Sequence, residues 1–252
     1  MYKIPANTLF LSKNVVFVPE CHSTNALAAD LAEGAPEGTV VITYHQTAGR
    51  GQRGNSWQTA PGLNFTLSII FYPHFLSPAQ QFALNIFSSL AVADYLQRYV
   101  YPPGRVKIKW PNDVMIDNKK ACGILIENQI TQRYINKSIV GVGLNINQTK
   151  FEHATACSLA LVTDLAFDLT EEFERLMEFM EARYLQLKQG KMQHLHEEYL
   201  SLLYWRNEMR NFKTAHGELE GVITGIDESG KLVVSANEAL HCFDLKEITY
   251  LS

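Results

Sequence analysis

The sequence predicts an α+β fold, with a mixed, largely antiparallel sheet on which helices pack, followed by a small β-barrel-like module. Strand-like runs follow one another in adjacent pairs and the helical segments are grouped apart from them, whereas a doubly wound α/β fold would alternate strand and helix. From Phe212 onward the pattern changes to short strands separated by glycine-containing turns, which predicts the C-terminal module.

The N-terminal half contains three strand-like runs and two capped helical segments. Ser23 or Thr24 is a natural N-cap for an alanine- and leucine-rich helix that is closed by Gly34. Ser77 followed by Pro78 combines a capping residue with a proline in the first turn, which is typical of a helix start. We therefore expect strands at residues 15–18, 40–44 and 64–72, a helix that follows Ser23-Thr24-Asn25 and ends at Glu33, and a helix from residue 77 to about residue 99.

The second half begins with apolar runs that read as successive antiparallel strands, with Asp117-Asn118 as the middle turn. Two amphipathic helical segments follow, separated at Gly190. The expected elements are strands at residues 106–110, 114–116, 122–130 and 134–145, helices at residues 169–188 and 192–205, and turns near residues 215–217 and 227–230.

Composition excludes several classes of protein. A formal net charge of −4 argues against bulk binding to DNA or RNA, which relies on a basic face. No apolar run approaches the roughly 18 residues of a membrane span, and the N-terminus lacks a basic-then-apolar signal. The four cysteines are scattered without a C-x-x-C pair, so free thiols are favoured over a metal site or disulfides. We therefore expect a cytoplasmic protein with no nucleic-acid or membrane partner.

A glycine-arginine loop at residues 46–57 is the most informative motif. Its glycines allow backbone N–H groups to approach a ligand closely, while Arg50 and Arg53 supply positive charge. Residues 39–93 contain no Asp or Glu, and these two arginines are the only Arg or Lys residues among them. Such a setting suits the oxygens of a phosphate or carboxylate.

The same loop matches the Gly-x-Gly-x-x-Gly fingerprint of dinucleotide-binding proteins, but its context does not. That fingerprint needs a helix opening within it and an acidic residue about 20 positions later. Here a second strand-like run follows at residues 64–72, and no carboxylate appears before Asp94. The loop is therefore predicted to lie in a hairpin, and a nicotinamide enzyme is disfavoured.

Several other polar positions are compatible with either structure or function. The run Lys109-Trp-Pro-Asn-Asp113 has the composition of an ordinary turn beside a core tryptophan. Simple strand alternation would place Lys120 with Cys122 on one face and Gly123 on the other, and a glycine within a strand often marks a close approach. The pair His194 and His196 lies at helical spacing i, i+2, so no metal site is expected.

The joint order of these motifs resembles that of the biotin–protein ligase family. The motifs are Ser-Thr-Asn at residues 23–25, Gly-Arg-Gly-x-x-Gly-x-x-Trp at 49–57, Lys-Trp-Pro-Asn-Asp at 109–113, Lys-x-x-Gly-Ile-Leu at 120–125 and Gly-x-Gly-x-Asn at 141–145. The resemblance implies a class II synthetase-like catalytic domain over residues 1–206 and an SH3-like C-terminal domain over residues 207–252. A winged-helix DNA-binding module is not expected, since 22 residues precede Ser23.

The resemblance also implies an activity, biotin–[acetyl-CoA-carboxylase] ligation in two steps. Biotin and MgATP give biotinyl-5′-AMP and pyrophosphate, and a lysine of a biotin carboxyl carrier protein then displaces AMP. The implied cofactors are biotin as substrate, ATP and Mg²⁺, without protein metal ligands, and the protein is a monomer or a homodimer. The implied site residues are Ser23, Thr24, Asn25 and Gln46 around biotin; Arg50, Gly51, Gln52, Trp57, Gly123 and Asn145 around the adenylate; and Lys120, Arg50 and Asp113 as catalytic groups.

One departure from the family pattern concerns the glycine-arginine loop. The bacterial motif reads Gly-Arg-Gly-Arg-x-Gly-Arg, whereas Gln52 and Asn55 stand here at the second and third arginines. Arg53, one position away, is a candidate to compensate, and weaker retention of the adenylate is expected. A glycine-rich loop of this kind is also expected to be mobile in the free enzyme and to order over the adenylate.

Two alternative functions stay open. A lipoate–protein ligase or octanoyltransferase shares the core architecture, but those relatives are not expected to carry the Gly-Arg-Gly loop with its tryptophan or the Lys-Trp-Pro-Asn-Asp run. A non-catalytic biotin sensor is the second alternative. The presence of Arg50, Asp113 and Lys120 argues against it.

Overall fold

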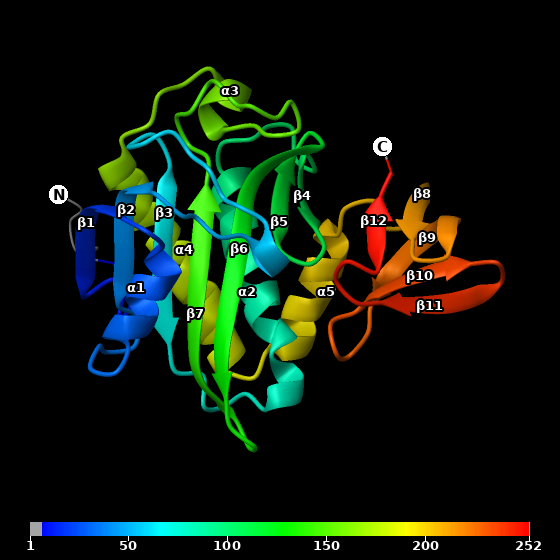
Figure 1. The fold of residues 1–252 in the computed structure, drawn as a ribbon, viewed down its shortest axis with the longest axis horizontal. Coiled ribbons are helices and arrows are strands. Elements are labelled where there is room, and N and C mark those ends of the chain that lie inside the picture. The colour runs from blue at the N-terminus through cyan, green and yellow to red at the C-terminus, as the bar shows by residue number, and fades with distance from the viewer. Residues whose placement is uncertain (1–6, 252) are drawn as a thin grey trace.

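The structure, a computed structural model, describes residues 7–251 except the side chain of Arg53. Two sheets form the framework (Figure 1), a seven-stranded one in the order β1-β2-β3-β7-β6-β5-β4 and a five-stranded one in the order β11-β10-β9-β8-β12. The larger sheet consists of β1 (Val15–Cys21), β2 (Val40–Gln46), β3 (Phe65–Phe71), β4 (Val106–Lys109), β5 (Asp113–Ile116), β6 (Lys119–Ile130) and β7 (Ile135–Leu144). The smaller sheet consists of β8 (Met209–Thr214), β9 (Gly217–Ile226), β10 (Leu232–Ala236), β11 (Ala239–Phe243) and β12 (Ile248–Tyr250).

The helices agree closely with the sequence prediction. Ser77 and Gln80 form the capping box that begins the 3-10 turn before α2, and Asp168 caps α4 by accepting from two backbone N–H groups. One short helix, α3, was not predicted, because five residues are too few to show a helical period. The helices are α1 (Thr24–Leu31), α2 (Phe82–Gln97), α3 (Leu159–Thr163), α4 (Leu169–Lys188) and α5 (Met192–Leu202), and the 3-10 turns are η1 (Gln52–Gly54) and η2 (Pro78–Gln80).

The α+β class is confirmed. Within the larger sheet β1 and β2 pair in parallel and every other pairing is antiparallel. Among the described residues between β2 and β3 the chain forms a single 3-10 turn and no α-helix, which agrees with the rejection of a dinucleotide fold. No helix in the range 7–251 is long and apolar enough to cross a membrane.

The two faces of the larger sheet are covered unequally (Figure 1). Helices α2, α4 and α5 lie behind it and enclose the main core, which includes Phe71, Phe87 and Tyr184. On the front face α1 covers one end, where Ala28 packs against Ile70 in a small separate cluster. The rest of the front face is therefore available for a site.

A buried carboxylate holds the N-terminal segment against α4. Glu181, 5% exposed, accepts hydrogen bonds from the backbone N–H groups of Leu9, Phe10 and Leu11 at 2.7, 2.8 and 2.8 Å. Leu11 is itself fully buried, so this contact fixes the chain where it enters the core. An ionised carboxylate that accepts several backbone hydrogen bonds is a strong interaction.

We expect Glu181→Ala to lower the free energy of unfolding by about 2–4 kcal/mol, because three backbone donors lose their acceptor. Urea denaturation would measure the loss. Glu178→Ala is the matched control, since this residue of the same helix accepts from the exposed Asn7 amide, and its effect should stay within about 0.5 kcal/mol. Equal effects of the two substitutions would contradict the assignment.

Candidate active site

Small residues on the central strands form the floor of a cavity on the front face of the sheet. Gly123 on β6 pairs across the strands with Gly143 on β7, and Leu125 pairs with Gly141. On β3, Ser68 pairs with Gly141 and is fully buried. With no side chains rising from the glycines, a cavity of about 300 Å³ opens above them. The Gly-x-Gly motif at residues 141–143 therefore creates space.

Trp57 forms one wall of the cavity by lying on this floor. A Cβ atom at Gly143 would come within 2.3 Å of the Trp57 ring, and one at Gly123 within 3.1 Å. The Trp57 backbone N–H donates to the Gly49 carbonyl at 2.9 Å, and Arg50 bridges Ser56 as an antiparallel pair. The glycine-arginine loop is thus a small hairpin folded over the sheet, in agreement with the prediction.

Polar side chains from α1, β2 and β3 meet at one end of the cavity. Gln46 accepts from the Thr24 backbone N–H at 2.7 Å and from its hydroxyl at 3.1 Å. The Ser68 hydroxyl lies 2.8 Å from Thr24 Oγ1 and 2.6 Å from Asn25 Oδ1. Ser23, Thr24, Asn25 and Gln46 form the polar end of the cavity wall, and Ser68 supports them from beneath the surface.

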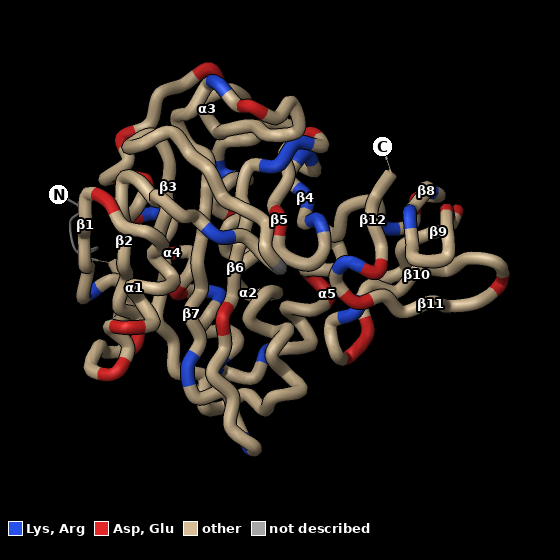
Figure 2. Tube along the Cα trace, in the orientation of Figure 1, with Lys and Arg blue, Asp and Glu red and all other residues tan. Residues whose placement is uncertain are grey.

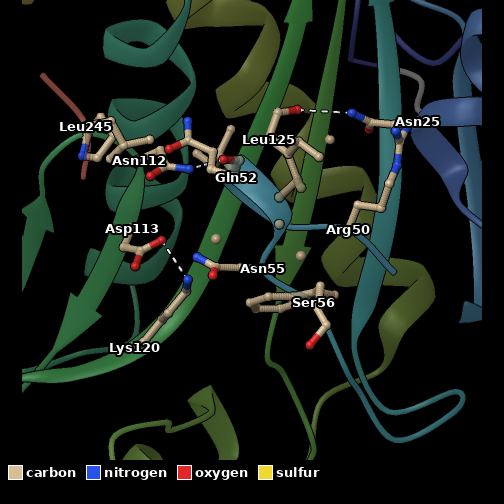
Figure 3. Close-up of a pocket in the computed structure, with 18 of the residues that line it drawn as sticks. Asn25, Arg50, Gln52, Asn55, Ser56, Asn112, Asp113, Lys120, Leu125 and Leu245 are labelled. Carbon is tan, nitrogen blue, oxygen red and sulfur yellow. Dashed lines mark hydrogen bonds and ion pairs between the residues drawn. The ribbon is translucent and has the colours of Figure 1, made fainter. Parts of the chain in front are cut away.

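Asn25 and Arg50 share a partner that the sequence did not indicate, Glu127. Asn25 Nδ2 donates to the Glu127 carboxylate at 2.7 Å and to the Leu125 carbonyl at 3.3 Å, so its amide is committed to protein partners (Figure 3). Arg50 Nη2 lies 3.2 Å from the same carboxylate. Glu127 itself does not line the cavity, and it therefore holds Arg50 from outside.

Lys120 and Asp113 form the charged end of the cavity. Lys120 Nζ lies 2.7 Å from Asp113 Oδ1 (Figure 3) and 5.4 Å from the centre of a Trp57 ring, within reach of a cation–π contact. Figure 2 shows basic segments gathered on β4 and at the start of β6, beside an acidic segment of β5. The three elements together concentrate positive charge beside the cavity.

The expected alternation along β6 was wrong at Lys120. The register between β5 and β6 shifts, so that Met115 pairs with Lys120 whereas Val114 pairs with Cys122. This β-bulge leaves Ala121 and Cys122 both buried and brings Lys120 to the face of Gly123, whose Cβ would lie 3.1 Å from Lys120 Nζ. Alternation cannot anticipate such an extra residue. The bulge is the feature that aims Lys120 into the cavity.

The C-terminal module completes the cavity wall. The Trp110 indole N–H donates to the Gly230 carbonyl at 2.8 Å and so ties the two sheets together. Lys109 Nζ lies 4.6 Å from the centre of the Tyr250 ring, and desolvation lowers the pKa of Lys109. Lys109 and Tyr250 were not among the predicted site residues. The residues that the module contributes to the wall are Leu245, Lys246, Ile248, Thr249 and Tyr250.

Asn145 lies apart from the other predicted residues. Its Nδ2 donates to the Cys157 carbonyl at 3.0 Å, and it lines a neighbouring depression that also borders Trp57 and Lys120. Asn145 Oδ1 is buried without a hydrogen-bond partner among the described residues. All the other predicted site residues line the main cavity, namely Ser23, Thr24, Asn25, Gln46, Arg50, Gly51, Gln52, Trp57, Asp113, Lys120 and Gly123.

The described residues give little support for a protein-held metal ion or a reactive cysteine. No group of three or more His, Cys, Asp or Glu residues in this part of the chain has the arrangement of a metal site. All four cysteines are free; Cys122 and Cys157 are buried, and desolvation raises the pKa of Cys157 to about 11. These two thiols are therefore structural.

Comparison with known proteins relates the chain to a single family. Residues 18–145 match the Biotin/lipoate A/B protein ligase family. The chain is 32% identical to the biotin–[acetyl-CoA-carboxylase] ligase of Mycobacterium tuberculosis, covering 89% of this chain and 87% of that protein. It is 28% identical to the bifunctional ligase/repressor BirA of Bacillus subtilis, covering 92% of this chain and 73% of that protein.

The fold leads to the same relatives. The biotin protein ligase of Aquifex aeolicus, solved in complex with biotin and ATP, superimposes with a TM-score of 0.78 at 24% identity, covering 94% of this chain and 98% of that one. At that identity the likeness concerns the fold. Because the family match spans half of the chain and the Mycobacterium relative is matched over most of its length, the chain belongs to the biotin/lipoate A/B protein ligase family.

Proposed function

We propose that this protein is an ATP-dependent biotin–protein ligase. In the first step a carboxylate oxygen of biotin attacks the α-phosphorus of ATP, the bond to the β-phosphate breaks, and biotinyl-5′-AMP and pyrophosphate form. In the second step a lysine amine attacks the acyl carbon and AMP leaves. The observation that carries the proposal is one cavity that joins a neutral polar end to a cationic end under a glycine-rich hairpin.

The polar end suits biotin and the cationic end suits the reacting anions. The hydroxyls of Ser23 and Thr24 and the amide of Gln46 match the neutral ureido ring, and the apolar wall around them matches the rest of the molecule. A carboxylate attacking a phosphate brings two anions together. Preorganised cations such as Arg50 and Lys120 stabilise the charge that develops on the phosphate oxygens.

The remaining predicted residues have supporting roles in this proposal. Trp57 and the hairpin shield the mixed anhydride from water, with Gly51 and Gln52 above the reacting groups. Gly123 allows Trp57 and Lys120 to lie close together. Asp113 orients Lys120. Asn145 borders the depression next to Trp57, which has space for a nucleoside.

Mg²⁺ is proposed to arrive with ATP. Among the residues that the structure describes, Asp113 is the one carboxylate in the cavity wall, and it is paired with Lys120 at 2.7 Å. Magnesium commonly retains waters and binds through substrate phosphates and one or two carboxylates. The residues present therefore fit an ion that is held mainly by the nucleotide, with the second oxygen of Asp113 as the protein oxygen in the cavity wall that could reach it.

The acceptor is proposed to be a lysine of a biotin carboxyl carrier protein, and the setting is proposed to be the cytoplasm. The Mycobacterium relative is named biotin–[acetyl-CoA-carboxylase] ligase, which supports a carboxylase component as the acceptor. The two alternatives, a lipoate or octanoate ligase and a biotin sensor without activity, differ from this proposal in the acid that they use or in the absence of turnover.

Biotin is expected to trigger pyrophosphate release from MgATP, and lipoate is not. Lys120→Ala should lower the rate about 10²–10³-fold, because the cation beside the reacting phosphate is lost. A coupled pyrophosphate assay measures both. Release with lipoate alone would support the first alternative, and no release with either acid would support the sensor.

Gly143→Ala tests the packing of Trp57. The new methyl group would overlap the indole, so Trp57 must move and the KM for ATP should rise about tenfold. Gly34→Ala is the control, because a Cβ at that position meets nothing within 4 Å. Steady-state kinetics of pyrophosphate release provide the measurement. Unchanged constants for Gly143→Ala would mean that Trp57 does not shape the nucleotide site.

Gln52→Arg tests the retention of the adenylate. Gln52 lines the cavity where arginine-rich relatives are expected to carry a cation, whereas the side chain of Arg53 lies outside the described residues. An added charge-assisted hydrogen bond should slow the dissociation of biotinyl-5′-AMP by about tenfold. Stopped-flow dissociation measures the rate. Gln129→Arg on the exposed end of β6 controls for net charge, and an equal effect there would refute the assignment.

A further inference from the structure

Lys109 is a cation in the cavity wall to which the proposed function gives no role. It lies on β4, opposite Asp113 in the neighbouring strand, and is partly buried. Within residues 7–251 no carboxylate lies within ion-pair distance of its ammonium group, since Asp113 is paired with Lys120. Its close neighbour is the ring of Tyr250, 4.6 Å away.

The cluster of Lys109, Asp113 and Lys120 carries one surplus positive charge. One carboxylate cannot neutralise two ammonium groups, and burial makes the surplus costly, which is why desolvation lowers the pKa of Lys109. Replacing such a lysine with an apolar residue would favour folding. An unpaired, partly desolvated cation in a cavity wall is typical of a site where a ligand brings the opposite charge.

Tyr250 provides an independent observation at the same place. Its hydroxyl is buried and has no hydrogen-bond partner among the described residues, although Tyr250 lines the cavity. Burial raises the pKa of Tyr250, so the hydroxyl keeps its proton at neutral pH. A buried hydroxyl without a partner costs free energy unless a ligand or water satisfies it. Lys109 thus places an ammonium group over an aromatic ring whose buried hydroxyl lacks an acceptor among the described residues.

We propose that Lys109 and Tyr250 bind the β- and γ-phosphates of ATP and then the pyrophosphate leaving group. This inference rests on the proposed ligase function. The strand order places Lys120 on β6, Asp113 on β5 and Lys109 on the edge strand β4, whereas Arg50 contacts Glu127 farther along β6. In this proposal Arg50 faces the carboxylate, Lys120 the α-phosphate, and Lys109, on the edge strand, the phosphates beyond it.

The reaction requires a stabilising group at that position. When the carboxylate oxygen bonds to the α-phosphorus, the bond from that phosphorus to the bridging oxygen breaks and its electron pair leaves on pyrophosphate. Attacking and leaving oxygens lie roughly in line in such a transfer, so the leaving group lies on the side away from the carboxylate. In this proposal the Lys109 ammonium group offsets the charge that pyrophosphate gains, and the Tyr250 hydroxyl donates a hydrogen bond to it.

Biotin-dependent exchange of labelled pyrophosphate into ATP tests the proposal in the full chain. For Lys109→Met we expect the inhibition constant of pyrophosphate and the KM for ATP to rise about tenfold or more, while the KM for biotin stays within about twofold. Lys109→Arg should restore most of the affinity. Tyr250→Phe keeps the ring but removes the hydroxyl, and should weaken pyrophosphate binding about threefold to tenfold.

Thermal unfolding and a matched control separate binding from folding. Lys109→Met should not lower the Tm, because it removes a desolvated charge, whereas a structural lysine would lower it. Lys107→Met is the control, since Lys107 lies on the same strand and face but outside the cavity wall. An active Lys109→Met enzyme with unchanged affinity for pyrophosphate would overturn the inference. A wild-type protein without biotin-dependent exchange would instead refute the proposed function.

Discussion

The site depends on the space that three glycines leave above the central strands. Side chains at Gly123, Gly141 or Gly143 would occupy the positions of Lys120, Asn25 and Trp57, respectively. Because the opposite face of the sheet is packed by α2, α4 and α5, the strands cannot yield to make room elsewhere. The cavity, its tryptophan wall and its polar end all follow from the missing side chains.

The cations around the cavity differ in how they are paired. Each of Arg50 and Lys120 is oriented by one carboxylate, Glu127 for the first and Asp113 for the second, whereas Lys109 has no ion-pair partner among the described residues and lies over the Tyr250 ring. Such fixed cations need little reorganisation when negative charge moves during the reaction. The C-terminal module contributes to the cavity wall because β12 supplies Tyr250. The Trp110–Gly230 hydrogen bond holds the module against the larger sheet.

Most helices and strands could be predicted from the sequence because their signals are local. The helix at residues 169–188 agrees with α4 at both ends, where Asp168 caps the start and Gly190 adopts a positive φ of 79° after the end. The turn at Asp117-Asn118 was also predicted, and both residues have positive φ angles. The short α3 was not predicted because five residues are too few to show a helical repeat. The domain boundary at residues 206 and 207 stays a prediction.

The sequence by itself determined the candidate site residues, since motifs identified the glycine-arginine loop, Lys120 and Asp113, which line one cavity in the structure. The tertiary structure alone decided how they meet. The bulge at Ala121 that turns Lys120 into the cavity depends on pairing with β5, and the commitment of the Asn25 amide depends on Glu127 about a hundred positions away. Lys109 and Tyr250 come together although about 140 positions separate them in the sequence. Local patterns carry no information about such partners, because register and burial are set by segments distant in sequence.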